Sequence, residues 1–263
     1  MASKAEREVG RALGATRRQI MVAAAAREIR DGEVVFVGMR LPLLGFALAR
    51  TLHAPRAVGL FENGVIRDSP PEGPLITMGD PPNILGALAC TTLLDVMGHL
   101  QRGAVDVGFL GGAEVDRYGN LNTTWAVDGG RRIRLPGSGG AADIAALSRR
   151  TVMIMQHERR RFPERVRFIT SPGYGAGPGW REGAGLGRGG PARVITSLGV
   201  FGFDPVSREM VLESVHPGVT REEVQNQTGW ALRVSPDLAE TPGPTREELD
   251  ALRRFDPDGI WTG

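Results

Sequence analysis

The chain has 263 residues, of which 41% are hydrophobic, so it is long enough to bury a substantial core. Its 32 basic and 30 acidic residues leave a net charge of +2, which excludes the strongly basic surface expected of a nucleic-acid-binding protein. A single cysteine, Cys90, excludes an intramolecular disulfide and a cysteine-rich metal site, and it predicts a reducing compartment. No segment approaches the roughly 20 apolar residues that cross a bilayer, and the first residues lack the apolar core of an export signal. We therefore expect a cytoplasmic protein that binds neither nucleic acid nor membranes.

The first part of the chain predicts alternating helices and strands. Residues 17–31 place apolar and small side chains at helical spacing and end in Asp31-Gly32, which predicts a helix followed by a strand at 33–38. A second helix is predicted between Pro42 and Pro55, and a second strand in AVGLFENG, residues 57–64. This order predicts parallel strands joined by crossover helices, with functional groups at the carboxyl ends of the strands.

The middle and the end of the chain change in texture. A mixed apolar segment at 83–101 precedes a predicted strand at 104–116, and a short helix at 139–150 precedes a strand at 151–158. Three further extended runs surround a glycine-rich loop at 171–190, namely 166–172, 192–203 and 209–217. Thr220 and Thr245 are each followed three residues later by a glutamate, which predicts two capped helices near the end of the chain.

Together these elements predict an α/β fold with an open, mostly parallel sheet flanked by helices and a β-rich C-terminal half. We expect one domain over residues 1–263, with residues 1–16 flexible.

One carboxylate stands out at the end of a predicted buried strand. In LFENGVI, residues 60–66, Glu62 is followed at once by Asn63 and Gly64, where the chain must turn sharply. A carboxylate in that position can be a general base, a metal ligand or a nucleophile, or simply a helix cap or a loop residue in a salt bridge. The histidines lack ligand spacing, so no metal site is predicted; they are His53, His99, His157 and His216.

Two further segments combine glycines with polar groups. FLGGAEVDRYGNLNTT, residues 109–124, carries Asn120 and Asn122 on either side of Leu121, so an extended backbone projects both amides to one side. LPGSGGAADI, residues 135–144, is a glycine-rich loop that enters a helix, an arrangement in which backbone N–H groups can converge on an anion. Each segment alone is equally compatible with tight turns and local side-chain hydrogen bonds.

The motifs occur in an order that resembles the B subunit of family I CoA-transferases, closest to the glutaconate CoA-transferase branch. The resemblance covers roughly residues 17–260 and rests on five motifs: VVFVGMRLPLLG, LFENG, FLGGAEVDRYGNLNTT, LPGSGGAADI and MIMQHERRRFPERVRFITSPGYGAGPG. It implies a partner A subunit of similar fold, in an αβ or α₂β₂ assembly, and an active site between the two subunits. It also implies that Glu62 is the catalytic glutamate of an E-N-G motif, with Asn63 and Gly64 on the side of the substrate.

The resemblance implies a mechanism that uses coenzyme A as a substrate and no permanently bound cofactor. A glutamate nucleophile conserves the thioester energy by passing through a mixed anhydride to a glutamyl-CoA thioester. The amides of Gly139 and Gly140 are the expected oxyanion donors, and Asn120 and Asn122 are expected to orient a loop that faces CoA. Two arginine runs are either phosphate contacts or solvated surface: Arg131, Arg132 and Arg134, and Arg159 to Arg161.

One position departs from the pattern of the resemblance. The loop after the first strand reads GMRLP, with Arg40 where the family usually has a second glycine. The Arg40 guanidinium is expected either to pair with Glu62 or to bind a substrate carboxylate. His157 and Glu158 are interpreted as a structural pair. Two alternatives remain, a CoA-thioester lyase or hydrolase on the same fold and a non-catalytic structural partner, although the presence of Glu62 argues against the former.

Overall fold

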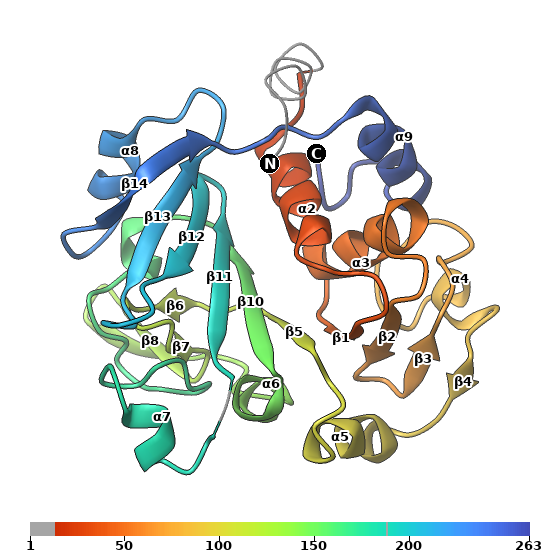
Figure 1. The fold of residues 1–263 in the computed structure, drawn as a ribbon, viewed down its shortest axis with the longest axis horizontal. Coiled ribbons are helices and arrows are strands. Elements are labelled where there is room, and N and C mark those ends of the chain that lie inside the picture. The colour runs from red at the N-terminus through yellow and green to blue at the C-terminus, as the bar shows by residue number, and fades with distance from the viewer. Residues whose placement is uncertain (1–13, 188) are drawn as a thin grey trace. The chain divides into compact units, whose positions relative to one another are not determined.

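A computed structural model describes residues 14–187 and 189–263 of the chain (Figure 1). The chain forms two compact units, the first made of Met1–Phe109 and Glu240–Gly263 and the second of Leu110–Ala239. The expectation of a single domain over 1–263 stays a prediction. Of the segment predicted to be flexible, 1–16, residues 1–13 lie outside the described residues.

The sheet of the first unit has a parallel centre and an antiparallel margin. Its strand order is β5-β1-β2-β3-β4. The strands are β1 (Val34–Val37), β2 (Val58–Phe61), β3 (Val65–Arg67), β4 (Ala89–Cys90) and β5 (Val107–Leu110). Strand β1 pairs in parallel with β2 and β5, whereas β3 pairs antiparallel with β2 and β4. The carboxyl ends of the three parallel strands therefore share one edge of this sheet.

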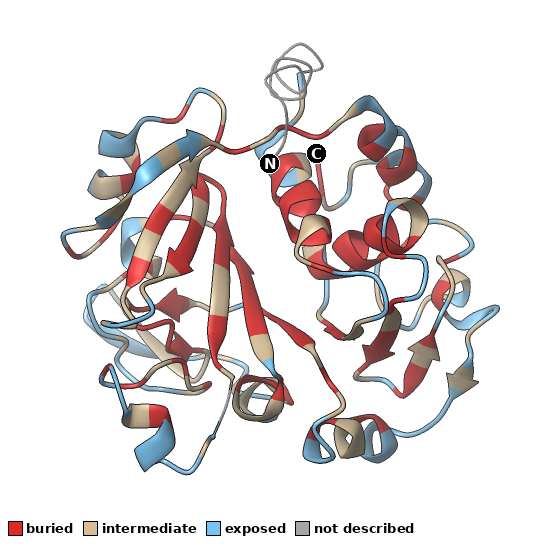
Figure 2. Ribbon diagram, viewed as in Figure 1, coloured by how far each residue is buried: buried red, intermediate tan, exposed pale blue. Residues whose placement is uncertain are grey.

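Helices of the first unit pack closely enough to bury an alanine run. The helices are α2 (Arg17–Arg27), α3 (Leu41–Leu52), α4 (Pro81–Ile84), α5 (Leu93–Gln101) and α9 (Arg246–Phe255). Ala23 to Ala26 of α2 are all buried (Figure 2), and a Cβ at Gly45 of α3 would lie 3.3 Å from the Ala25 Cβ. Arg27 joins α2 to α9 through an ion pair of 2.6 Å with Glu248, which secures the C-terminal segment to this unit.

The second unit combines one larger sheet with two small ones. Its larger sheet has the order β14-β13-β12-β11-β10, in which β10 and β11 are parallel and β11, β12 and β13 are antiparallel. These strands are β10 (Arg150–Met155), β11 (Pro191–Thr196), β12 (Gly199–Phe203), β13 (Met210–Val215) and β14 (Arg233–Glu240). The small sheets pair β6 (Glu114–Val115) with β7 (Leu121–Asn122), and β8 (Trp125–Asp128) with β9 (Arg131–Arg134). The helices are α6 (Ala141–Leu147), the 3₁₀ turn η1 (Arg159–Arg161), α7 (Trp180–Gly183) and α8 (Arg221–Asn226).

Most predicted elements are confirmed with shorter bounds. The β-α-β order over β1, α3 and β2 is present, and α2 ends at Arg27 rather than near residue 31. Thr220 and Thr245 cap α8 and α9, because their hydroxyls accept the N–H groups of Glu223 and Glu248 at 3.1 Å. In the described part of the chain, no helix is both long and apolar enough to cross a membrane.

Three predicted strands were wrong in detail. The run 104–116 divides into β5 and β6 because Gly111 and Gly112 interrupt it, and 192–203 is the hairpin of β11 and β12. The run 166–172 contains no strand; its Thr170 and Ser171 N–H groups donate to Leu121 across a loop. Strand β14 was missed because its sequence, RVSPDLAE, is polar and contains a proline, as is tolerated at a sheet edge.

Candidate active site

Glu62 lies in a tight turn at the carboxyl end of β2, as the sequence predicts. The Gly64 N–H donates to the Phe61 carbonyl at 2.9 Å, so residues 61–64, here the Glu62 turn, close a four-residue reversal into β3. Gly64 has a φ of +97°, whereas neither Glu62 nor Asn63 has a positive φ. Negative φ at both central residues, followed by a glycine with positive φ, matches a type I turn with a glycine bulge.

Gly64 is fixed by the chain that follows β4. The Thr91 N–H and hydroxyl both donate to the Gly64 carbonyl, at 2.8 and 2.9 Å. A Cβ on Gly64 would stand 2.2 Å from the Thr91 carbonyl oxygen, closer than real contacts allow. The turn therefore needs glycine here for space as well as for its backbone angle.

The side chain of Asn63 holds the turn from the other side. Its amide Nδ2 donates to the Met78 carbonyl at 3.0 Å, and its Oδ1 accepts the Val65 N–H at 3.3 Å. These contacts tie the turn to the loop before α4. The predicted contact of Asn63 and Gly64 with substrate stays a prediction.

The Glu62 side chain itself is half-buried, next to a fully buried neighbour. Phe61 points into the core and meets the Phe46 ring edge-on, with centroids 5.8 Å apart. Because β1 and β2 pair Val37 with Phe61, Gly38 and Glu62 leave the sheet side by side at its carboxyl edge. The strand thus buries its apolar end and delivers a carboxylate to the edge where parallel α/β sheets bind ligands.

Arg40 stands at the same edge, two residues beyond Gly38, in a strained backbone conformation. Its φ of 66° and ψ of −120° lie in a region that glycine populates readily and other residues rarely do. Such a conformation costs on the order of 1–3 kcal/mol for a residue with a side chain. The exposed Arg40 guanidinium lies over the Trp261 ring, 5.5 Å from its centroid.

Of the two expectations for Arg40, the ion pair with Glu62 is not observed. Within residues 14–187 and 189–263, the recorded side-chain partner of Arg40 is Trp261, and no carboxylate pairs with it. Sequence reasoning missed Trp261 because no local pattern connects residue 261 to a loop more than 200 positions earlier.

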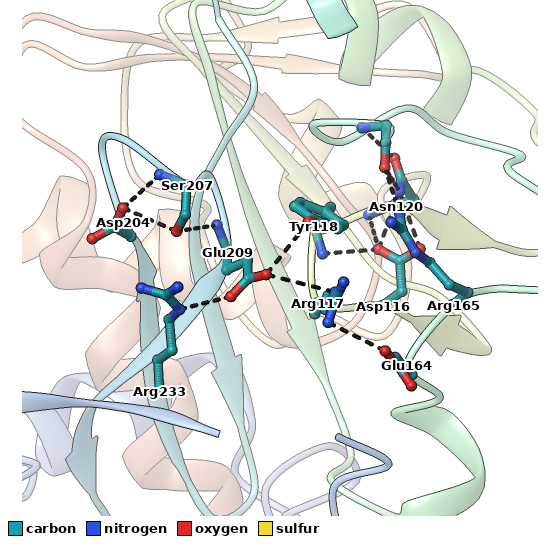
Figure 3. A network of polar contacts seen from close by, with 11 residues as sticks. Asp116, Arg117, Tyr118, Asn120, Glu164, Arg165, Asp204, Ser207, Glu209 and Arg233 are labelled. Carbon is teal, nitrogen blue, oxygen red and sulfur yellow. Dashed lines mark hydrogen bonds and ion pairs between the residues drawn. The ribbon is translucent and has the colours of Figure 1, made fainter. Parts of the chain in front are cut away.

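Asn120 is completely buried and supports the glycine-rich loop. Its Oδ1 accepts the N–H groups of Gly173 and Gly175, both at 2.9 Å, and its Nδ2 donates to the Gly175 carbonyl at 2.8 Å. The same Nδ2 donates to Asp116 at 3.1 Å (Figure 3). Burial raises the pKa of the Asp116 carboxyl, against the hydrogen bonds from Asn120, Val166 and Tyr118, which lower it. The observed role of Asn120 is thus to position a loop.

Asn122 is equally buried and equally engaged. Its Nδ2 donates to Glu114 at 2.8 Å and to the Trp125 carbonyl at 2.7 Å, and its Oδ1 accepts the Thr124 N–H at 3.0 Å. Glu114 is buried as well and pairs with Arg167. The expectation that Asn120 and Asn122 orient a loop that faces CoA stays a prediction.

Gly139 and Gly140 lie at the start of α6, as the sequence predicts. Gly139 is exposed with a φ of +49°, and Gly140 is the buried N-cap residue of the helix. The preceding loop is held by the Gly137 N–H, which donates to the Thr123 carbonyl at 2.8 Å. These glycines and the two asparagines belong to the second unit, whereas Glu62, Asn63, Gly64 and Arg40 belong to the first.

The His157 ring is buried and hydrogen-bonded, as expected of a structural residue, but its contacts are not with Glu158. The ring is stacked on Phe162 with centroids 3.8 Å apart, and its two nitrogens contact the hydroxyls of Thr196 and Thr228, each at 3.1 Å. Burial, with a smaller effect of nearby His216, lowers the pKa of His157 to about 3, so the ring is neutral near pH 7.

The charged residues after His157 form ion pairs or hydrogen bonds within the chain, whereas the arginines of β9 are exposed. Glu158 pairs with Arg160 and Arg161, and Arg159 donates to the Thr228 carbonyl at 2.9 Å. Arg131, Arg132 and Arg134 are exposed on β9. No group of three or more His, Cys, Asp and Glu side chains in the described residues is arranged to hold a metal ion.

Comparison with protein families matches residues 18–227 to the model described as coenzyme A transferase. The B subunit of 3-oxoadipate CoA-transferase from Pseudomonas knackmussii is 40% identical over 240 residues, covering 90% of this chain and 92% of that protein. The B subunit of glutaconate CoA-transferase from Acidaminococcus fermentans is 35% identical over 254 residues, covering 91% of this chain and 94% of that protein.

Solved structures agree with these sequence matches. The crystal structure of glutaconate coenzyme A-transferase from Acidaminococcus fermentans superposes with a TM-score of 0.86 at 32% identity, covering 94% of this chain and 97% of that one. The decarboxylase AibA/AibB matches with a TM-score of 0.78 at 30% identity, covering 93% and 96%. The predicted α/β fold, with its open sheet flanked by helices, is thereby confirmed.

Proposed function

Because this chain belongs to the coenzyme A transferase family, we propose that it is the B subunit of a heteromeric CoA-transferase in which Glu62 is the nucleophile. The observation that supports this most directly is the Glu62 turn. It holds a half-buried carboxylate at the carboxyl edge of parallel strands, on a backbone fixed by Gly64 and Asn63. A nucleophile supported in this way loses little entropy when it meets a substrate.

The proposed reaction proceeds in two symmetric halves. A Glu62 carboxylate oxygen attacks the acyl-CoA carbonyl carbon, the C–S bond breaks, and an acyl-glutamyl anhydride and CoA thiolate result. The thiolate then attacks the Glu62 carbonyl carbon of the anhydride, which forms a glutamyl-CoA thioester and releases the first acid as a carboxylate. A second carboxylate repeats the steps in reverse, so that it leaves as a new acyl-CoA and Glu62 is regenerated. Coenzyme A is a substrate of this reaction. Each step makes and breaks its bonds without a permanently bound cofactor.

Glycine and asparagine residues supply the supporting roles in this proposal. Each attack on a carbonyl creates an oxyanion, for which the amides of Gly139 and Gly140 at the start of α6 are the proposed donors. One such donor is typically worth about 100- to 1,000-fold in rate. Asn120 and Asn122 act by holding the loops around them, since their amide groups are already engaged.

A partner A subunit, in an αβ or α₂β₂ assembly, is part of the proposal. Both relatives at 35% and 40% identity are named as B subunits. In the first unit, four leucine side chains after α4 and at the start of α5 are exposed, as is typical of an interaction surface: Leu85 57%, Leu88 61%, Leu93 51% and Leu94 80%. We expect the purified chain alone to be inactive.

The proposed substrate class is short dicarboxylic acids and their CoA thioesters. The relatives at 40% and 35% identity are named for 3-oxoadipate and glutaconate, and both are dicarboxylates. A relative named as a cholesterol ring-cleaving hydrolase subunit, from Mycobacterium tuberculosis, is more distant at 28% identity. Transfer is therefore favoured over hydrolysis, and the presence of Glu62 favours it over decarboxylation.

Trapping the intermediate tests this proposal. The assembled complex is incubated with an acyl-CoA and then with borohydride or hydroxylamine, which attack a thioester, and peptides are analysed by mass spectrometry. We expect loss of activity together with modification at Glu62, and neither change when the acyl-CoA is omitted. Turnover of the acyl-CoA without any modification at Glu62 would instead indicate a hydrolase or a lyase.

A further inference from the structure

Arg40 combines three features that the fold alone does not require. It lies at the carboxyl edge of the parallel strands, three residues after Val37, whose partner across the β1–β2 pairing is Phe61, the residue before Glu62. Adjacent strands are about 5 Å apart, so the loop that carries Arg40 begins within one strand spacing of the Glu62 backbone. A long side chain on that loop can reach a ligand bound at Glu62.

The backbone of Arg40 would favour a glycine. At a φ of 66° and ψ of −120°, any residue with a Cβ is strained. Arg40 is the N-cap residue of α3, and its contact with the helix is made by its carbonyl, which accepts the Leu43 N–H at 3.0 Å. Glycine would provide the same carbonyl without strain. The side chain therefore has to contribute something that offsets the strain.

The Arg40 guanidinium contacts an aromatic ring but no carboxylate among the described residues. Trp261 lies under it at 5.5 Å, and the main-chain N–H of Trp261 is itself anchored to the buried Asp256 carboxylate at 3.2 Å. A cation on an aromatic face keeps its charge and its N–H donors, because the ring takes no proton and accepts no in-plane hydrogen bond. In the described chain no carboxylate occupies those donors, and the Arg40 side chain is exposed.

We propose that Arg40 is a specificity-determining residue that binds the second carboxylate of a dicarboxylic substrate, whose first carboxyl either carries CoA as a thioester or attacks the glutamyl-CoA thioester. This inference rests on the proposed function, because it needs the reacting carboxyl at Glu62. A guanidinium presents paired N–H groups that match a carboxylate, so a diacid gains an ionic, bidentate contact that a monoacid of equal length lacks. Arg40 acts here in substrate binding, with Trp261 as its positioning residue.

The test compares two thioesters with the same five-carbon chain, glutaryl-CoA and valeryl-CoA, as donors to Glu62 in the assembled complex. The measured quantity is the ratio of their single-turnover kcat/KM values for modification of Glu62. We expect the native complex to favour glutaryl-CoA and Arg40→Gly to reduce that preference by about 10- to 100-fold, the range for a lost hydrogen bond to a charged group. Arg40→Lys, which keeps the charge without the planar fork, should restore part of the preference.

Arg208 provides a matched control in the second unit. It is the other described non-glycine residue with positive φ, at 60°, and its guanidinium lies over the Tyr174 ring at 5.1 Å. Arg208→Gly also replaces an arginine of positive φ by glycine and removes the same kind of cation–ring contact, and it should leave the thioester ratio unchanged. Thermal unfolding of all three variants verifies that they are folded.

The outcomes separate this inference from the proposed function. If neither thioester modifies Glu62 in the native complex, the proposed nucleophile is wrong and the inference falls with it. If Glu62 is modified but valeryl-CoA reacts as well as glutaryl-CoA, or Arg40→Gly and Arg208→Gly give the same ratio, then Arg40 does not read a second carboxylate while the nucleophile assignment stands.

Discussion

The Glu62 turn of the first unit and the loop around Asn120 in the second unit use polar side chains in opposite ways. In the Glu62 turn, the fixing contacts come from the neighbours: the Gly64 carbonyl is bound by Thr91, and the Asn63 amide is bound to Met78. Glu62 itself stays half-buried at a sheet edge. In the Asn120 loop, the polar side chain is the fixing contact.

The number of hydrogen bonds that the Asn120 amide can form shows how fully this side chain is used. An asparagine amide offers two N–H donors and two acceptor positions on its oxygen. Asn120 uses both acceptor positions for Gly173 and Gly175 and both donors for Asp116 and the Gly175 carbonyl. A saturated, fully buried side chain has no group left for a substrate, so it can contribute to binding only by shaping the loop. The comparison predicts that changes at Glu62 alter chemistry and changes at Asn120 alter stability.

The largest expected effect is the loss of CoA transfer in Glu62→Gln. The amide is not a nucleophile toward a thioester, so the rate should fall by roughly 10⁴-fold or more, as for other removed nucleophiles. The free energy of unfolding in urea and the binding of the A subunit should be largely retained, because glutamine has the same shape as glutamate and the turn is also held by its backbone and by Asn63. Glu72→Gln, which alters an exposed glutamate of the same unit, is the control and should retain full activity. Substantial exchange by Glu62→Gln would contradict the nucleophile assignment.

The next effect is on stability, in Asn120→Ala. Removing the amide leaves the buried N–H groups of Gly173 and Gly175 without their acceptor. It also removes the side-chain hydrogen bonds to the Asp116 carboxylate, which keeps its main-chain donors. The free energy of unfolding should fall by about 3 kcal/mol. The control is Asn226→Ala, an exposed asparagine at the end of α8, for which a change within about 0.5 kcal/mol is expected. Urea unfolding of both variants measures the difference. If Asn120→Ala kept native stability but lost CoA transfer, Asn120 would be a substrate contact and the comparison would fail.

The same contrast shows which parts of the molecule were predictable from sequence. The Glu62 turn depends on adjacent residues, a buried strand followed by Glu-Asn-Gly, so its position at the end of β2 followed from local pattern. The partners of Asn120 lie some 55 residues along the chain in the glycine-rich loop, and those of Arg40 at position 261. No periodicity encodes such pairings, since they arise only when separate elements pack. For the same reason, 166–172 was predicted as a strand although its N–H groups bind a distant loop.

Some glycines indicate where distant parts of the chain come into contact. A Cβ at Gly173 would lie 2.3 Å from the Gly119 carbonyl carbon, and one at Gly175 would overlap the Trp180 ring. Gly64 is similarly confined by Thr91. Gly64 and Gly173 thus lie where two backbone segments touch, although the sequence does not say which two segments they are.

The smallest expected effect concerns His157, which extends the comparison to the core of the second unit. Its pKa is lowered to about 3 by burial and by His216, whereas an unfolded histidine has a pKa of 6.5. The folded state therefore binds fewer protons than the unfolded state between these values, and stability falls as pH decreases through 6.5. From pH 6.5 to 5.5 this single group should remove about 1 kcal/mol from the free energy of unfolding, before most carboxylates titrate.

Measuring the free energy of unfolding against pH in His157→Gln isolates that contribution. The glutamine keeps a polar group near the hydroxyls of Thr196 and Thr228 but loses the ring stacked on Phe162, so the variant should be less stable than the native chain at pH 7.5. Because glutamine takes up no proton, the variant should lose less stability between pH 6.5 and 5.5. If His157 were instead a proton carrier for the reaction, the variant would change the pH profile of CoA transfer. A changed pH profile of CoA transfer, with an unchanged pH dependence of the free energy of unfolding, would therefore assign His157 to the chemistry. In that case the contrast between a reactive carboxylate at Glu62 and polar side chains that only support the second unit would not hold at His157.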